Sequence, residues 1–179
     1  MENLSKKKYP KIGVLGGTFD PPHKGHLHIS KVALKKFKLK KILWIITKKN
    51  PLKKKPQLSK SKRVFLSKKI VKKEKKIFVK YFDDKIKSSN TFNLLKYIKK
   101  NNKKTEIYFL IGADNLLKFH KWNNWEKITR LAKIAIFPRK NYSSRSLSPV
   151  VSKKLDKKDF IYIKAKKINI SSSLIRKYW

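Results

Sequence analysis

Residues 11–38, KIGVLGGTFDPPHKGHLHISKVALKKFK, hold the pattern that decides the fold. The apolar run Lys11–Gly17 has the length of a β-strand and ends in two glycines, which let the backbone turn tightly. After the turn, His26–Lys38 repeats apolar residues at helical spacing. A strand that leads through a glycine turn into a helix is the first half of a βαβ unit, so a parallel sheet is expected.

The same alternation continues along the chain. Further strands are predicted at Ile42–Thr47, Ile77–Phe82, Ile107–Ile111, Lys133–Phe137 and Ile161–Lys164. Further helices are predicted at Ser61–Val71, Thr91–Lys100, Trp125–Leu131 and Ser171–Lys177, with a short one after Gly112. This order predicts an α/β fold: one domain over residues 1–179, built as a Rossmann-like, doubly wound parallel sheet with helices on both faces.

Composition narrows the class of protein. With 179 residues, 40% hydrophobic and 12% aromatic, the chain is able to bury a core and is not disordered by composition. The absence of cysteine excludes disulfides and thiolate metal sites. The longest uninterrupted apolar run, Ile42–Ile46, is far shorter than the roughly 20 residues that span a bilayer. No secretory signal precedes Pro10, so a cytoplasmic protein without a membrane partner is expected.

The net charge of +40 has two interpretations. Such a balance is typical of proteins that bind nucleic acid. However, only five of the fifty basic residues are arginine, the side chain suited to bidentate contacts with phosphates and bases. The excess is lysine, accompanied by many isoleucines and asparagines, which favours codon bias acting on a solvated surface. We therefore expect the charge to attract anionic nucleotides, and expect no specific nucleic-acid partner.

Unusual residues follow several of the predicted strands. They are the segments Gly16–Gly17, Gly112–Asp114, Pro138–Arg139 and Ser171–Ser173. In an open parallel sheet, ligands bind beyond the carboxyl ends of the strands, near the point where strand order reverses. The sequence therefore predicts that these segments meet at one edge and form a single site.

The segment Gly16–His26 is suited to phosphate. Gly16, Gly17 and Thr18 allow backbone N–H groups to approach a ligand, and a helix that starts near Gly25 presents its positive end to an anion. His23 and His26 lie three residues apart, so both imidazoles can donate to phosphate oxygens. The alternative, a glycine turn with two surface histidines, fits the Gly-Gly pair alone better than it fits the complete segment.

Two other segments have both a chemical and an ordinary interpretation. Ser171 or Ser172 caps the last predicted helix, whose N–H groups, with Arg176, can hold a triphosphate. Gly112 allows close approach of a ligand, and the Asp114 carboxylate is suited to ribose hydroxyls. Taken alone, the serines are an ordinary cap beside a surface arginine, and Asp114 is a helix cap.

The segment GGTFDPPHKGH (residues 16–26) resembles the N-terminal signature of the HxGH nucleotidyltransferase superfamily. Within it the chain is most similar to the bacterial nicotinate-nucleotide adenylyltransferases, through Thr47–Lys53, Phe109–Trp125 and Ile170–Arg176. The resemblance covers nearly the whole chain. It implies transfer of AMP from ATP to nicotinate mononucleotide, giving deamido-NAD and pyrophosphate in NAD biosynthesis. It also implies Mg²⁺, which we expect to be carried mainly by ATP phosphates because no carboxylate cluster offers a metal cage.

The resemblance assigns roles to individual positions. Expected catalytic residues are His23, His26 and Arg176. Expected ATP-binding residues are Gly16, Gly17, Thr18, Phe19, Gly25, Gly112, Asp114, Arg139, Ser171 and Ser172. Expected nicotinate-mononucleotide-binding residues are Lys53, Thr91 and Trp122, of which Trp122 is to stack on the pyridine ring.

The acceptor segment departs from the family pattern. Asn90 stands where the family has tyrosine, and Asn93 and Leu94 stand where it has Asp and Thr. This weakens the pocket assignment around Thr91. Trp122 and Lys53 also have ordinary interpretations, as a core side chain and as one lysine among many.

The mechanism implied is direct attack of the mononucleotide phosphate on the α-phosphorus of ATP, without a covalent enzyme intermediate. Two alternatives stay open: an adenylyltransferase for nicotinamide mononucleotide or phosphopantetheine, and a non-catalytic, basic nucleic-acid-binding protein. The sequence leaves the choice between acid and amide at the pyridine ring, and the oligomeric state, undecided.

Overall fold

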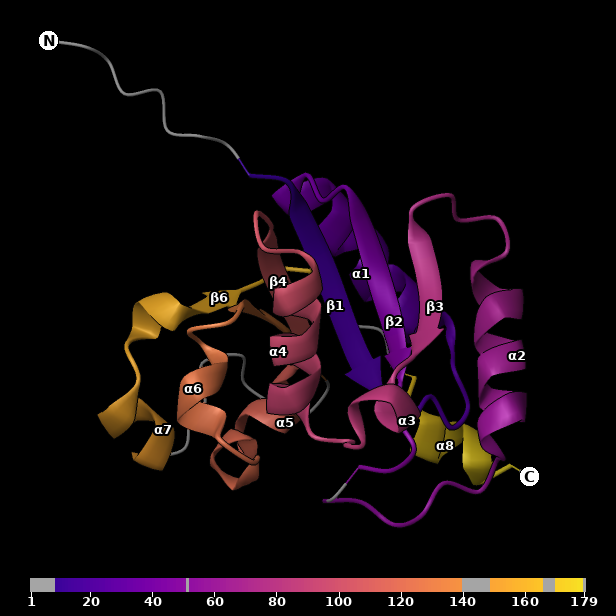
Figure 1. Cartoon of the computed structure of the whole chain (residues 1–179). Helices are drawn as coiled ribbons and strands as arrows, with labels where there is room; N and C mark the ends of the chain where they lie inside the picture. Colours follow the sequence, from indigo (N-terminus) through magenta and orange to yellow (C-terminus); the bar gives the residue numbers. More distant parts are fainter. Residues whose placement is uncertain (1–8, 51, 140–148, 166–169, 179) are drawn as a thin grey trace, which may run out of the picture.

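The computed structural model describes residues 9–50, 52–139, 149–165 and 170–178. Within them a six-stranded sheet runs in the order β3-β2-β1-β4-β5-β6, and every pairing is parallel. The strands are β1 (Lys11–Gly17), β2 (Lys41–Ile46), β3 (Ile77–Tyr81), β4 (Glu106–Gly112), β5 (Lys133–Phe137) and β6 (Phe160–Tyr162). Figure 1 shows β1 and β2 at the centre of the molecule, with helices around them. The predicted parallel α/β architecture is confirmed.

Helices connect these strands. The longer ones are α1 (Lys24–Phe37), α2 (Lys60–Val71) and α4 (Thr91–Asn101). The short ones are α3 (Asp83–Ile86), α5 (Ala113–Leu116), α6 (Trp125–Ile128), α7 (Pro149–Lys154) and α8 (Ser172–Arg176), with 3₁₀ turns η1 (Phe119–Lys121) and η2 (Lys157–Asp159). No helix in the described part of the chain is long and apolar enough to cross a membrane.

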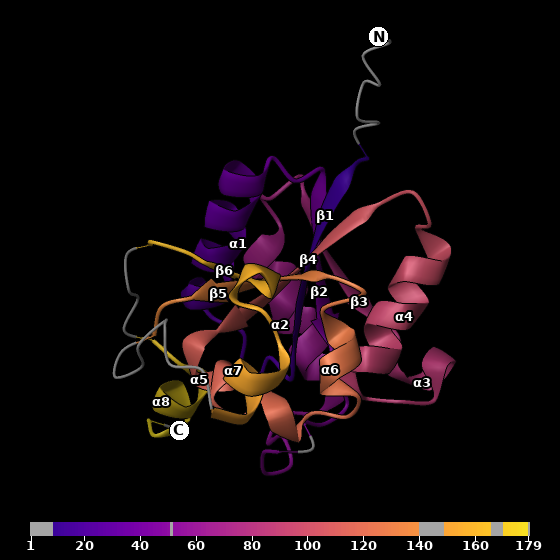
Figure 2. The ribbon, with the colours of Figure 1, turned by 90° about the vertical axis from the view of Figure 1, so that its left-hand side faces the viewer.

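The sheet is buried on both faces, which explains why its central strands are almost entirely apolar. On one face, Ala33 and Phe37 of α1 and Val71 of α2 pack on the sheet. On the other face, Leu95 of α4 and Ile128 of α6 pack on it. Figure 2 shows α1 and α4 on opposite sides of the strands. This is the doubly wound arrangement that the alternation of strands and helices predicts.

Strand order reverses between β1 and β4. The chain moves outward from β1 to β2 and β3, and then returns to place β4 against the other side of β1. The connections that leave β1 and β4 therefore diverge to opposite faces of the sheet. This divergence opens a crevice at the carboxyl ends of the two strands, which positions the site described below.

Some boundaries differ from those predicted. Helix α1 begins at Lys24 rather than His26, because His23 caps it. Helix α6 ends at Ile128, where the N–H groups of Leu131 and Ala132 donate to the Ile128 carbonyl in a turn that leads into β5. Helix α7 has no counterpart among the predicted elements.

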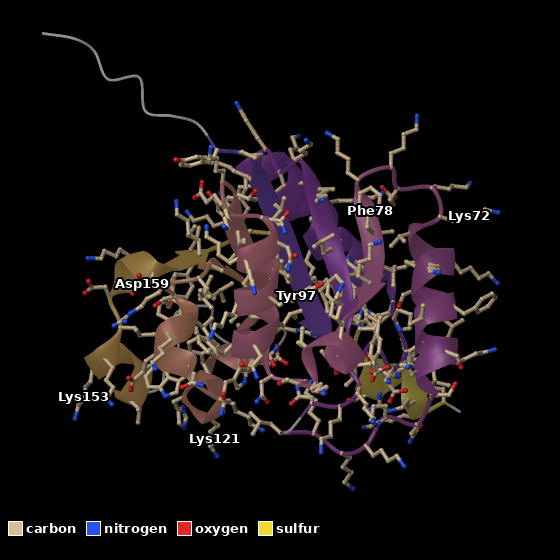
Figure 3. The ribbon with its side chains drawn as sticks, in the orientation of Figure 1. Lys72, Phe78, Tyr97, Lys121, Lys153 and Asp159 are labelled. Carbon is tan, nitrogen blue, oxygen red and sulfur yellow. The ribbon has the colours of Figure 1, made fainter. Side chains whose placement is uncertain are left out.

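The lysine excess lies on the outside of the molecule. Lys72, Lys121 and Lys153 are exposed, and Figure 3 shows their side chains extending away from the ribbon. An exposed lysine keeps its ammonium in water at little cost to the fold. The positive charge therefore does not disturb the apolar core.

Candidate functional site

A cavity of about 730 Å³ opens at the carboxyl edge of the sheet. It brings together all but one of the residues singled out from the sequence: Gly16, Gly17, Thr18, Phe19, His23, Gly25, His26, Lys53, Thr91, Gly112, Asp114, Trp122, Arg139, Ser171 and Ser172 line it. Arg176, the exception, lies beside the cavity. The segments that follow β1, β2, β4 and β5 thus meet at one edge, as the position of the switch in strand order predicts.

The histidine pair is held by backbone hydrogen bonds at the start of α1. Nδ1 of His23 accepts from the N–H of Gly25 at 3.1 Å, and Nδ1 of His26 accepts from the N–H of His23 at 3.2 Å. This is a capping box made of two imidazoles. Because each neutral ring uses Nδ1 as an acceptor, its proton is on Nε2. Each histidine therefore has one N–H to donate to a ligand.

The environment keeps both imidazoles neutral. Burial, followed by the nearby positive charge of Arg139, lowers the pKa of His23 from 6.5 to about 4. Burial also lowers the pKa of His26 well below its ordinary value, and the neighbouring His23 and Arg139 lower it further. The ring centroids lie 3.8 Å apart, so protonating both rings together is unfavourable. Near neutral pH the pair consists of neutral hydrogen-bond donors.

Aromatic rings form the floor beneath His26. The Phe19 ring is buried, lies 4.7 Å from the His26 ring and stacks on Trp44 at 5.1 Å. The indole N–H of Trp44 donates to the Ser30 hydroxyl, which donates to the His26 carbonyl. This packing fixes the position of the first turn of α1.

Gly25 is required by the capping box. A Cβ atom at this position would lie 2.8 Å from Nδ1 of His23 and 3.1 Å from Cγ2 of Ile170. The N–H of Gly25 is the donor that orients His23. A side chain here would displace the imidazole that the backbone is holding.

Asp114 and Arg139 face each other beyond the ends of β4 and β5. Arg139 Nε lies 3.4 Å from Oδ1 of Asp114, an ion pair without hydrogen-bond geometry. A Cβ on Gly112 would lie 2.4 Å from that same oxygen and 3.0 Å from Arg139 Nε, so only glycine leaves room for the pair. Asp114 thus keeps acceptor capacity beside the cavity, and Arg139 adds a cation.

Helix α8 closes the cavity from the other end of the chain. The Ser171 hydroxyl caps it by accepting from the N–H of Leu174, and the Ser172 hydroxyl donates to the Pro21 carbonyl at 2.8 Å. Arg176 Nη1 donates to the Asp20 carbonyl, and its Nη2 donates to the Ser173 hydroxyl. These contacts join α8 to the turn after β1, and they direct the guanidinium of Arg176 to Asp20 rather than into the cavity.

The opposite wall is formed by the segment Ser88–Leu94. The Ser88 hydroxyl accepts from the N–H of Asn90 and from Nδ2 of Asn93, and Ser89 donates to Asp83. Asn93, which departs from the family pattern, thus supports the turn that leads to Thr91. Trp122 lies across this wall, packed edge-on against Phe109 at 6.0 Å and tilted against Phe119 at 5.3 Å.

Lys53 lines the cavity from the loop between β2 and α2; the residue as a whole is exposed, and its ammonium is partly desolvated by the groups around it. Burial lowers its pKa, the negative charge of Asp114 opposes that shift, and Arg139, Lys118 and Arg176 add to it. Lysines on the outer surface keep their ammonium groups hydrated. The Lys53 ammonium is instead partly desolvated, and most of its charged neighbours are cations. It therefore gains most from an anionic ligand.

Four residues in or around the site were given no functional role from the sequence. Asp20 and Asp83 are buried carboxylates that accept backbone N–H groups, Arg63 is a buried cation, and His28 lines the cavity. Asp83 was expected in a simple turn and His28 at a structural or surface position. Only Arg63 carried a signal, as one of five arginines in a lysine-rich chain.

The described residues include no group of three or more His, Cys, Asp or Glu side chains placed to hold a metal ion. Asp20 and Asp83 already accept backbone N–H groups, and Asp114 stands alone beside the Arg139 cation, with its Oδ1 outside any hydrogen bond that the described residues make. These residues do not fit a protein-held cation site.

Comparison with known proteins agrees with this geometry. The Cytidylyltransferase-like family profile matches residues 14–178. The chain is 47% identical over 175 residues to the probable nicotinate-nucleotide adenylyltransferase of Pelagibacter ubique (strain HTCC1062), which covers 98% of this chain and 96% of that relative. It is 34% identical over 128 residues to the probable enzyme of the same name from Ruegeria sp. (strain TM1040), covering 72% of this chain and 67% of the relative.

Solved structures agree on the fold. The Plasmodium falciparum nicotinic acid mononucleotide adenylyltransferase complexed with NaAD superposes with a TM-score of 0.73 at 23% identity, covering 95% of this chain and 84% of that one. At this identity the match establishes the architecture alone. The family profile and the relatives at 47% and 34% identity establish more: the chain belongs to the cytidylyltransferase-like family and, within it, to the nicotinate-nucleotide adenylyltransferases.

Proposed function

We propose that this chain transfers AMP from ATP to nicotinate mononucleotide, releasing pyrophosphate and forming deamido-NAD. The observation that carries the proposal is the pair His23 and His26, whose Nδ1 atoms accept backbone N–H groups and leave both Nε2–H groups to donate. The names of the relatives support the same reaction.

The chemistry needs no nucleophile from the protein. A phosphate oxygen of the mononucleotide attacks the α-phosphorus of ATP, a new P–O–P bond forms, and the bond to the β-phosphate breaks. Negative charge shifts onto the departing pyrophosphate, so fixed N–H donors and cations lower the barrier. Neutral imidazoles are suited to this role because their Nε2–H groups donate to phosphate oxygens, and a bound triphosphate raises their pKa and so favours the cationic ring as charge builds up.

The two substrates occupy different parts of the cavity in this proposal. ATP lies over Gly16–Thr18 and His26, with its ribose near Asp114. Nicotinate mononucleotide lies toward Thr91, with its pyridine ring against Trp122 and its phosphate near Lys53, while Arg139 stays on the ATP side beside Asp114. The positive charges of Lys53 and Arg139, which both line the cavity, favour this anion-rich arrangement.

Mg²⁺ belongs to the proposal as part of the nucleotide. Small hard cations that retain water are commonly bound through substrate phosphates. We therefore expect Mg²⁺ to be brought by ATP, where it neutralises phosphate charge, and we assign it no protein ligand.

One experiment tests the reaction and its acceptor. The purified chain is incubated with MgATP and nicotinate mononucleotide, nicotinamide mononucleotide or phosphopantetheine, and both pyrophosphate and product mass are measured. We expect deamido-NAD as the main product and at least tenfold lower kcat/KM with the other acceptors. A preference for another acceptor would overturn the assignment of the substrate.

A second measurement addresses the alternative of a nucleic-acid-binding protein. DNA and RNA binding is followed while the salt concentration is raised, because binding dominated by phosphate contacts weakens steeply with salt. Tight, salt-steep binding combined with no pyrophosphate release would favour that alternative. Pyrophosphate release that depends on the mononucleotide would exclude it.

A further inference from the structure

Arg63 of α2 is a buried cation whose partners are backbone carbonyls. The residue is almost fully buried, with only 2% of its surface exposed. Nη1 donates to the carbonyls of Thr18 at 2.6 Å and Thr47 at 2.7 Å, and Nε donates to that of Leu58 at 3.2 Å. A weaker contact joins Nη2 to the Lys48 carbonyl at 3.4 Å. One guanidinium thus joins the turn after β1 to both ends of the loop between β2 and α2.

Two buried carboxylates hold the same loop ends through their N–H groups. Asp83 accepts from the N–H of Lys48 at 2.6 Å. Asp20 accepts from the N–H groups of Gln57 and Leu58, both at 2.9 Å. The loop therefore starts and finishes at fixed points, with Lys53 between them.

We propose that Arg63 is a positioning residue: it holds the loop base, Thr47–Lys48 and Leu58, against the Gly16–Thr18 turn, and thereby places Lys53 in the cavity. This inference rests on the proposed function, since it assigns Lys53 to the mononucleotide phosphate. Arg63 does not line the cavity and acts through the segments that it joins.

The choice of arginine supports this role. The carbonyl oxygens of Thr18, Thr47 and Leu58 converge and would repel one another without a cation between them. A planar guanidinium presents donors in several fixed directions at once, whereas a lysine ammonium at the end of a flexible stem does not reproduce that spacing. In a chain that otherwise uses lysine for nearly all its basic residues, arginine stands where this geometry is needed.

The test is a double-mutant cycle on the full chain, with kcat/KM for nicotinate mononucleotide as the measurement. Arg63→Lys keeps the charge and loses the fork, and Lys53→Ala removes the side chain that the loop carries. We expect each single variant to lose about tenfold, and the double variant to lose no more than about thirtyfold. A loss near the product of the single losses, about a hundredfold, would overturn the inference, as would an Arg63→Lys variant with wild-type kcat/KM.

A matched control makes the same chemical change at a site without this geometry. Arg130 is exposed and lies outside the cavity. Arg130→Lys is expected to combine multiplicatively with Lys53→Ala, with no loss of its own. Hydrogen exchange of the Gln57 and Leu58 amides, read on the same proteins, is expected to rise in Arg63→Lys and not in Arg130→Lys. Unchanged exchange in Arg63→Lys contradicts a role in holding the loop.

If Arg63→Lys does not fold, Asp83→Ala tests the same loop base from the other side. It removes Oδ2, which accepts from the N–H of Lys48 and from the Ser89 hydroxyl. Non-additivity with Lys53→Ala supports the inference, and independent losses overturn it. A wild-type chain without activity would instead refute the proposed function, so the two failures are distinguishable.

Discussion

The two ends of the cavity are built in different ways. At the phosphate end, His23 and His26 are oriented by N–H groups no more than three residues away. At the acceptor end, the segment Ser88–Leu94 depends on side chains, since Ser88 holds Asn93 and Asp83 links Ser89 to the distant Lys48. The contrast teaches that the histidine pair is oriented by backbone groups of its own turn, whereas the acceptor wall is held by side chains, one of which also reaches the distant Lys48.

This difference has a consequence for substitution. A local backbone motif tolerates little change, because the backbone conformation of each residue in it sets the position of a catalytic side chain. A wall made from side-chain hydrogen bonds accepts replacements that restore a partner, as the Asn93–Ser88 contact does at a position where the family pattern has Asp. The phosphate end should therefore be sensitive to mutation, and the acceptor end more tolerant.

The largest effect is expected at His26. In His26→Ala the Nε2–H donor is lost, and removal of one such donor typically lowers kcat on the order of 10²–10³. Pyrophosphate release at saturating substrates measures it. His26→Asn is the matched variant, because its side-chain oxygen can still accept from the N–H of His23. If His26→Asn retained wild-type kcat, the capping contact rather than the donor would be what matters.

The protonation of His23 is expected to make the free energy of unfolding depend on pH. Its pKa is about 4 in the folded chain and near 6.5 when exposed, so between these values the unfolded chain takes up a proton that the folded chain does not. The free energy of unfolding is therefore flat above about pH 6.5 and falls as the pH drops toward 4, by roughly 3 kcal/mol from this residue.

Urea unfolding across that range measures the slope. His23→Asn is the control, since it retains an oxygen acceptor for the N–H of Gly25 and removes the titrating ring. We expect a shallower slope in the variant. Identical slopes in the two proteins would show that acid acts elsewhere.

Gly25→Ala separates positioning from stability. Its Cβ would lie 2.8 Å from Nδ1 of His23, and the Cβ of Gly13→Ala would lie equally close, 2.8 Å, to Cγ1 of Ile42 in the core. We expect both variants to lose about 1–3 kcal/mol of stability, and only Gly25→Ala to lose on the order of 10- to 100-fold in kcat. Urea midpoints and steady-state kinetics give the two values. Equal kcat in the two variants would mean that the His23 orientation is not critical.

The smallest effect is expected at the acceptor wall. Asn93→Ala removes the hydrogen bond to Ser88, worth about 1 kcal/mol, so KM for nicotinate mononucleotide should rise about three- to fivefold with KM for ATP unchanged. Asn101→Ala removes a comparable bond, to the Tyr97 carbonyl, at the far end of the same helix and should leave both KM values unaltered. A rise in KM for ATP in Asn93→Ala would show that the two ends are not separate.

The same contrast explains what the sequence could predict. The strand Lys11–Gly17 and the phosphate segments that follow the strands were predicted because their signals are local: apolar runs, glycine turns and helix caps. The start of α1 was placed two residues late, because histidine is not among the usual N-cap residues. The roles assigned to individual site residues remain predictions.

The residues that were missed depend on contacts remote in sequence. Arg63 reaches Thr18, 45 residues away, and Asp83 reaches Lys48, 35 residues away. No periodicity or spacing encodes such pairs. The orientation of Arg176 also escaped prediction, since it is set by the Asp20 carbonyl at the other end of the chain.

The contact between α8 and the turn after β1 has a consequence during synthesis. Ser172 bonds to Pro21 across 151 positions, and Arg176 bonds to Asp20 across 156. Domains begin to fold while the ribosome is still extending them. In a nascent chain strands β1 to β5 are therefore synthesised first, and the closing helix, which begins at Ser172, follows soon after β6 ends at Tyr162. The nucleotide site of the nascent chain stays open on one side until then, so we expect ATP to be held only after residues 171–176 have been released.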